Sequence, residues 1–153
     1  MSLDELHLHR LLVAVDGSEN ASLALRAAIT AARRDHATVT LICIAPDARA
    51  EFSSFALAAG VAPTPQEALD AEAERILREA VRLVPDDIPV KTLVKRGKPG
   101  PAIVAHAAEC DYDAILLGAR GVGRVGALIG SVSAYVLHHA GVAVFVAHAP
   151  ASA

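Results

Sequence analysis

The sequence is short of aromatic side chains and of positive charge, and these shortages exclude one class of partner. Three phenylalanines and two tyrosines are present, and tryptophan is absent. The 14 Lys and Arg residues are outnumbered by 17 Asp and Glu residues, which gives a formal net charge of −3. A surface that binds nucleic acid needs a basic face and rings on which bases stack. We therefore expect no nucleic-acid partner.

Long apolar runs, a secretory signal and paired cysteines are also missing. No apolar run approaches the roughly 18–20 residues that span a membrane, and the N-terminus has no basic stretch followed by an apolar one. The two cysteines, Cys43 and Cys110, form no C-x-x-C pair, which is typical of reduced cysteines in a cytosolic protein. We expect a cytoplasmic protein with no membrane partner.

Apolar residues make up 54% of the sequence, and they form short runs that alternate with helical patterns. Such uninterrupted runs are typical of strands buried on both faces of a parallel sheet. We therefore expect one domain over residues 1–153 with an α/β fold: an open five-stranded parallel sheet, doubly wound in the strand order 3-2-1-4-5, with helices on both faces. The expected strands span 11–15, 38–44, 88–95, 114–117 and 142–146, and the expected helices span 21–34, 68–84, 99–109 and 131–140.

The region before the second expected helix is the least regular. Residues 46–63 have a mixed composition and no clear period, so we expect a mobile loop that includes a short helix. The next residues match a helix start, with Thr64 as N-cap, Pro65 at the first helical position and Glu67 closing a capping box. The face of this helix that we expect to be buried carries Leu69, Ala73, Ile76, Ala80 and Leu83.

Glycine is concentrated in one segment. Five of the ten glycines fall between Gly118 and Ser131, after an expected strand and before an expected helix. Glycine lets the backbone approach an anion closely, and the free N–H groups of a first helical turn point toward it. Arg120 and Arg124 add positive charge to this segment of an acidic chain. The segment therefore predicts a binding site for a phosphate group.

Two common phosphate-binding motifs are excluded here. Residues 121–126 match G-x-G-x-x-G, but they follow the fourth strand rather than the first, and no acidic residue comes after Gly126 to hold a ribose. A P-loop needs a lysine directly before its Ser or Thr, and Ser131 follows Gly130 directly. The sequence therefore predicts neither a dinucleotide fingerprint nor a P-loop.

Several stretches of the chain resemble the universal stress protein family. The C-terminal half of that family is similar to residues 113–121, 130–133 and 139–146, and its first two strands are similar to residues 12–18 and 39–44. The resemblance covers nearly the whole chain apart from its two ends and the irregular region. It implies the same α/β fold that the apolar runs predict.

The nucleotide-binding branch of this family carries the pattern G-x2-G-x9-G-[ST] and binds ATP between strands one and four. The resemblance implies that Gly118 and Gly121 lie beside the ribose and phosphates, and that Gly130, Ser131 and Val132 offer backbone N–H groups and a hydroxyl to the phosphates, with Arg120 nearby. It also implies that Asp16, with Gly17, contacts the ribose or adenine, and that Ile44 and Leu117 contact the adenine. The implied cofactor is ATP, with AMP or ADP as alternatives, accompanied by Mg2+ that the phosphates hold.

The chain departs from the family pattern at one point. Eight residues, rather than nine, separate Gly121 from Gly130. Either Gly123 and Gly126 make the backbone permissive enough to absorb the loss, or the shorter loop moves away from the phosphates. Asp16 also has a second interpretation, because an aspartate after a strand can shape the turn that begins the next helix.

Three functions remain open. The first is an ATP-binding stress-response protein that acts as a dimeric, nucleotide-dependent regulator. The second is a dimeric interaction module of the same fold without a nucleotide, and the third is a slow ATPase. No residue is placed as a general base that activates water, so we predict no catalytic residue and no metal ligand. Universal stress proteins commonly dimerise through their last strand, here Val142–Val146, whose apolar edge invites pairing with a second copy.

Overall fold

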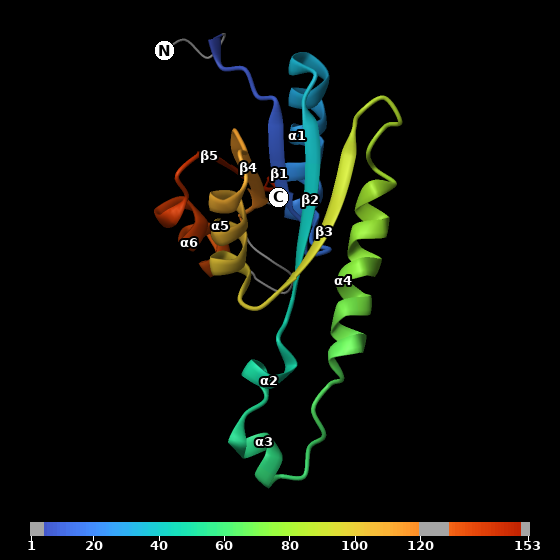
Figure 1. The fold of residues 1–153 in the computed structure, drawn as a ribbon, viewed down its shortest axis with the longest axis vertical. Helices are drawn as coiled ribbons and strands as arrows, with labels where there is room; N and C mark the ends of the chain where they lie inside the picture. The colour runs from blue at the N-terminus through green and yellow to red at the C-terminus, as the bar shows by residue number, and fades with distance from the viewer. Residues whose placement is uncertain (1–4, 120–128, 151–153) are drawn as a thin grey trace.

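The computed structural model describes residues 5–119 and 129–150 of the chain. Its centre is a five-stranded sheet with parallel neighbours in the order β3-β2-β1-β4-β5 (Figure 1). This confirms the predicted parallel sheet and its strand order. The strands are β1 (Arg10–Ala14), β2 (Thr38–Ala45), β3 (Val90–Arg96), β4 (Ala114–Gly118) and β5 (Ala143–Ala147).

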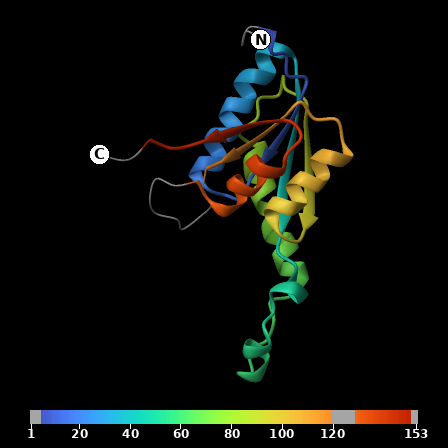
Figure 2. The same ribbon diagram turned by 90° about the vertical axis from the view of Figure 1, so that its left-hand side faces the viewer.

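Helices cover both faces of the sheet. The two long helices α1 and α4 pack on one face, and α5 and α6 pack on the other (Figures 1 and 2). Within the described ranges, none of the helices combines the length and the apolar character needed to cross a membrane. The helices are α1 (Glu19–Asp35), α2 (Ala48–Glu51), α3 (Ser54–Ala58), α4 (Gln66–Val81), α5 (Pro99–Glu109) and α6 (Ser131–His139).

Neighbouring residues of β1 belong to two different cores. Leu11 and Val13 pack in the cluster shared with α1 and α4, whereas Leu12 packs in the cluster shared with α5 and α6. Successive side chains of a strand point to opposite faces of the sheet. A strand that fills two cores therefore needs an uninterrupted apolar run, which is the pattern from which the sheet was predicted.

The central strand β1 is the place where the winding of the sheet reverses. It pairs with β2 on one side and β4 on the other, so that Leu12 lies opposite both Thr40 and Ile115. The chain builds outward from β1 to β3 in one direction and from β4 to β5 in the other. Open α/β sheets bind ligands beyond the carboxyl ends of their strands at such a reversal. The ends of β1 and β4 are therefore the expected position of a site.

The start of α4 differs from the prediction. Pro65 is the N-cap and its side chain makes no capping hydrogen bond, so the predicted capping box of Thr64 and Glu67 is wrong. The first helical residue is Gln66, whose side-chain Nε2 donates to the carbonyl oxygen of Pro46 at 2.9 Å. A contact with a distant part of the chain has replaced the local cap.

The buried face of α4 is also shifted from the predicted one. Ala73, Leu77 and Ala80 are the buried residues of the helix, and Leu77 was not predicted. Leu83 was expected to be buried but is 45% exposed, because the helix ends at Val81 and Leu83 lies in the turn beyond it. The spacing of the buried residues follows the period of an amphipathic helix.

Residues 46–65, which we call the arm, project away from the sheet and carry α2 and α3 (Figures 1 and 2). The predicted loop with one short helix therefore contains two. Neither helix has a buried residue. Phe55, Leu57 and Val61 are 81%, 67% and 54% exposed, so the described chain leaves these three apolar side chains of the arm uncovered.

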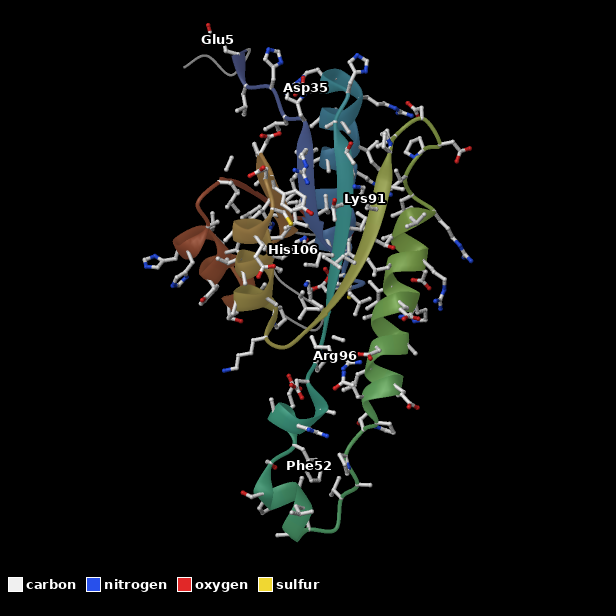
Figure 3. All side chains as sticks on the ribbon, viewed as in Figure 1. Glu5, Asp35, Phe52, Lys91, Arg96 and His106 are labelled. Atoms are coloured by element: carbon white, nitrogen blue, oxygen red, sulfur yellow. The ribbon has the colours of Figure 1, made fainter. Side chains whose placement is uncertain are left out.

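The base of the arm is tied to α4 and β3. The Gln66 side chain accepts the backbone N–H of Ala48 at 2.9 Å and donates to the carboxylate of Asp70 at 2.9 Å. Arg96, labelled in Figure 3, donates to the same carboxylate from the end of β3. The hydrogen bond from Arg96 lowers the pKa of Asp70 most, and the hydrogen bond from Gln66 lowers it further. The arm is thus exposed along its length and held at its base.

At the opposite end of the sheet, two aspartate carboxylates bind the backbone of residues 8–10, which lead into β1. Buried Asp35 accepts the backbone N–H of Leu8 at 2.9 Å and a guanidinium N–H of Arg34 at 2.7 Å. These two hydrogen bonds hold the pKa of Asp35 well below its usual range, and the bond from Arg34 has the larger effect. Asp113 accepts the backbone N–H groups of residues 9 and 10 at 2.7 and 2.8 Å.

Candidate functional site

A cavity of about 310 Å3 lies where the winding of the sheet reverses. Its walls come from the carboxyl ends of β1, β2 and β4 and from the first turn of α6, with single residues of α1 and α4 and two of α5. Seven of the ten predicted site residues line it: Asp16, Ile44, Leu117, Gly118, Gly130, Ser131 and Val132.

Three predicted residues are not in this lining. Gly17 lies beside Ile76, at a neighbouring hollow between α1 and α4. Arg120 and Gly121 lie outside the described residues. The residues that do meet in the cavity come from parts of the chain as far apart as the β1–α1 turn and α6, as expected for strand ends that share one edge of a parallel sheet.

The turn after β1 is built around Asp16. Its Oδ1 accepts the backbone N–H of Ser18 at 2.9 Å, and the hydroxyl of Ser18 in turn accepts the backbone N–H of Ala21 at 3.2 Å as the N-cap of α1. Gly17 between them has a φ of +82°, which favours glycine. The interpretation that Asp16 shapes the turn is confirmed. Its second oxygen, Oδ2, has no hydrogen-bond partner within the described part of the chain.

Gly118 stands where β4 meets the start of α1. A Cβ atom added at this position would lie 2.7 Å from the Cβ of Asn20 and 2.8 Å from the backbone N of Ala21. Real side chains do not approach so closely, so the glycine is required by packing as well as being a lining residue of the cavity. Asn20 is itself buried, and its Oδ1 accepts the backbone N–H of Ala149 at 2.9 Å.

The first turn of α6 faces the cavity without a side-chain cap. Gly130 is the N-cap, and no acidic residue stands in the first turn. The N–H groups of a first helical turn have no acceptor within their own helix, and here Ser131 and Val132 line the cavity. Free N–H groups and the positive end of the helix dipole favour an anion at this position.

Hydrogen bonds hold α6 against the end of β4. The carbonyl oxygen of Ala119 accepts the backbone N–H of Gly130 at 2.5 Å and the hydroxyl of Ser133 at 2.7 Å. The N–H of Ala119 donates to the carbonyl oxygen of Ala147, directly after the β4–β5 ladder, at 2.7 Å. Neither Ser133 nor Asn20 was predicted from the sequence as part of the site. The one available signal was a second serine two residues after Ser131.

The opposite wall of the cavity is apolar. Ile42, Ile103 and Leu117 are at most 2% exposed, and Ile44 completes the wall at the end of β2. Such a surface suits a flat ring that gives up its contact with water.

The lining also contains a thiol that carries no charge. Burial raises the pKa of Cys43 to about 11, and the negative charges of Asp16 and Glu72 add to the rise. The thiolate is the nucleophilic form of cysteine, so at neutral pH Cys43 acts as a packing residue. Asp16 is then the charged group among the described lining residues.

Three kinds of surface therefore converge in one cavity: an apolar wall, a carboxylate and an uncapped helix N-terminus. A carboxylate accepts hydrogen bonds from hydroxyl groups, and the helix terminus accepts an anion. A ligand that carries a flat ring, hydroxyls and an acidic group fits this set. Over the described ranges, no group of three or more His, Cys, Asp or Glu side chains is arranged to hold a metal ion.

Comparison with known families agrees with the resemblance seen in the sequence. The model of the Universal stress protein family matches residues 7–148. The universal stress protein Sll1388 of Synechocystis sp. is 34% identical over 140 residues, which cover 85% of this chain and 91% of that protein. The universal stress protein YxiE of Bacillus subtilis is 26% identical over 134 residues, which cover 82% and 88%.

Solved structures share the fold. The universal stress protein UspA from Lactobacillus plantarum has a TM-score of 0.75 at 28% identity and covers 94% of this chain and 99% of its own. The universal stress protein from Archaeoglobus fulgidus in complex with dAMP has a TM-score of 0.67 at 23% identity, with 93% and 99% covered. An Arabidopsis thaliana member of the family with AMP bound has a TM-score of 0.65 at 16% identity, with 94% and 93% covered.

Proposed function

Because the chain belongs to the universal stress protein family, we propose that it is a stress-response protein that binds an adenine nucleotide and acts as a dimeric, nucleotide-dependent regulator. The observation that carries the proposal is the meeting of an apolar wall, the Asp16 carboxylate and the uncapped start of α6 in one cavity. The AMP and dAMP bound to related structures support the class of ligand.

In the proposed complex each part of the nucleotide has a different partner. The adenine ring packs against Ile44 and Leu117, and the ribose hydroxyls donate to the free oxygen of Asp16. The phosphates accept the N–H groups of Ser131 and Val132, where the helix dipole favours negative charge. Gly118 and Gly130 line the same cavity, and the predicted contacts of Arg120 and Gly121 complete the proposed site.

The proposed ligand is ATP, with AMP and ADP as alternatives that share every contact except those of the outer phosphates. Mg2+ accompanies the nucleotide through its phosphate oxygens, since Mg2+ commonly keeps several waters and takes few protein ligands. Cys43 and Cys110 are both free, which supports a cytoplasmic location for the protein.

The proposed dimer forms through β5. This strand pairs with β4 on one side, and its other edge is the end of the described sheet. Phe145 near the middle of the strand is 40% exposed. An edge strand with an apolar side chain favours pairing with a second copy, as the family resemblance also implies.

The test of nucleotide binding begins with native mass spectrometry of the purified protein, which identifies any adenine nucleotide that copurifies. Added AMP, ADP or ATP at about 100 times its Kd should raise the free energy of unfolding by about 2.7 kcal/mol. Asp16→Asn keeps an oxygen for the N–H of Ser18 but removes the charge, and should weaken binding about tenfold. Asp86→Ala, on an exposed residue, is the control. An empty protein whose stability none of the three nucleotides changes would contradict the proposal.

Two alternatives keep the same fold. The arm favours an interaction module without nucleotide, since Phe55 is 81% exposed and no Asp, Glu, Lys, Arg or His occurs between Phe52 and Gln66. A slow ATPase would release phosphate from ATP, and Asp16→Ala or Ser131→Ala would abolish that release. Activity that survives both changes would come from a contaminant and would remove the ATPase alternative.

A further inference from the structure

A buried hydroxyl lies in the first turn of α6, among the residues that line the cavity. Ser133 is 1% exposed, and its Oγ lies 2.7 Å from the carbonyl oxygen of Ala119 and 3.2 Å from that of Gly130. A serine hydroxyl has one proton to donate, and the shorter contact shows that Ala119 receives it. This bond joins the first turn of α6 to the end of β4.

The acceptor of this bond is itself held in place. The same carbonyl oxygen of Ala119 accepts the N–H of Gly130, and the N–H of Ala119 donates to the carbonyl oxygen of Ala147 in β5. Ala119 and Gly130 are therefore fixed to each other and to the sheet by bonds between described residues.

We propose that Ser133 is a positioning residue for the anion-binding end of the cavity. Its hydroxyl holds the first turn of α6 so that the N–H groups of Ser131 and Val132 face the ligand. This inference rests on the proposed function, because it concerns the phosphate end of the same site.

The other contacts of the nucleotide come from different elements. Ile44 and Leu117 lie at the ends of β2 and β4, and Asp16 lies after β1. None of them is a partner in the bond between Ser133 and Ala119. Loss of this bond should therefore weaken the hold on the phosphate and leave the hold on adenosine intact. A weaker hold on the phosphate with an unchanged hold on adenosine distinguishes a positioning role from a general loss of structure.

The experiment compares AMP with adenosine by calorimetry on the purified full chain. In Ser133→Ala the affinity for AMP should fall about tenfold, which corresponds to about 1.4 kcal/mol, while the affinity for adenosine stays within about twofold. Amide exchange without ligand should show faster exchange of the Gly130 N–H in the same variant. The control is Ile88→Val in the core, which lowers stability away from the site and should leave both affinities unchanged.

The outcomes separate this inference from the proposed function. An unchanged ratio of the two affinities in Ser133→Ala, or an equal fall in both, would overturn the positioning role and leave nucleotide binding standing. Failure of the unchanged protein to bind adenosine and all three of AMP, ADP and ATP would overturn the proposed function, and the positioning role with it.

Discussion

Gly118 connects packing with the site at the scale of a single residue. Its missing side chain lets the end of β4 approach Asn20 and the backbone of Ala21 to distances that a Cβ atom cannot occupy. Gly118→Ala should therefore lower the free energy of unfolding by about 1–3 kcal/mol, since an added methyl group must displace backbone. Urea unfolding measures this loss.

The matched control for this change is Gly141→Ala. A Cβ atom at Gly141 has no heavy atom within 4 Å, so its substitution should alter stability by no more than about 0.5 kcal/mol. Equal stability of the two variants would show that β4 and α1 are not packed as described.

Asp35 makes the stability of the protein depend on pH. Its folded-state pKa is depressed, chiefly by the hydrogen bond from Arg34 and then by that from Leu8. The stabilisation is therefore complete above the ordinary pKa of an aspartate and is lost as the pH falls toward the folded-state value. Unfolding free energies of the natural chain and Asp35→Asn should differ most above about pH 5 and converge toward about pH 2. A difference that stays constant over this range would contradict the assignment.

Single residues also mark where prediction from sequence stops. Gly130 and Ser131 were predicted because the signal is local: glycines, then a helix start. Ser133 and Asn20 were missed because their partners lie 14 and 129 residues away, and only the folded chain brings them together. The ligand contacts assigned to the predicted site residues, Arg120 and Gly121 included, stay predictions.

At the scale of elements, the apolar runs predicted the sheet because strands that fill two cores need them. The start of α4 was predicted wrongly because the contacts that hold it are not local. Thr64 and Glu67 satisfy a local capping pattern, but Gln66 bonds to Ala48 and Pro46, which lie 18 and 20 residues away. A long-range side-chain contact can replace a local cap, and no local pattern reports it.

Gln66 should control how firmly the arm is held. Gln66→Ala removes the bonds to the backbone of Pro46 and Ala48, each worth about 1 kcal/mol. The base of the arm should then open more often, and limited proteolysis should cut the arm about thirtyfold faster, as a loss of about 2 kcal/mol implies. Glu67→Ala, on the exposed neighbouring residue, is the control and should leave the cleavage rate unchanged. Equal rates for the two variants would show that the arm is held by other contacts.

At the scale of the whole molecule, the proposed dimer makes a prediction that involves two exposed phenylalanines. Phe145 lies on the edge strand and Phe55 on the arm. In Phe145→Glu the new charge would face its own copy across the two-fold axis, and like charges in paired strands are destabilising. Sedimentation should show a dimer that dissociates at least about tenfold more readily.

Phe55→Glu introduces the same charge far from β5 and should leave the dimer intact. A dimer lost in Phe55→Glu and kept in Phe145→Glu would move the interface from the sheet edge to the arm.

The arm can change in sequence without any change in the cores or the cavity. No residue between 46 and 65 belongs to either core, and none lines the cavity. Its length and composition can therefore diverge between duplicated genes while the cavity stays intact. Under the proposed function, such paralogues in one cell would direct one small-molecule signal to different recipients.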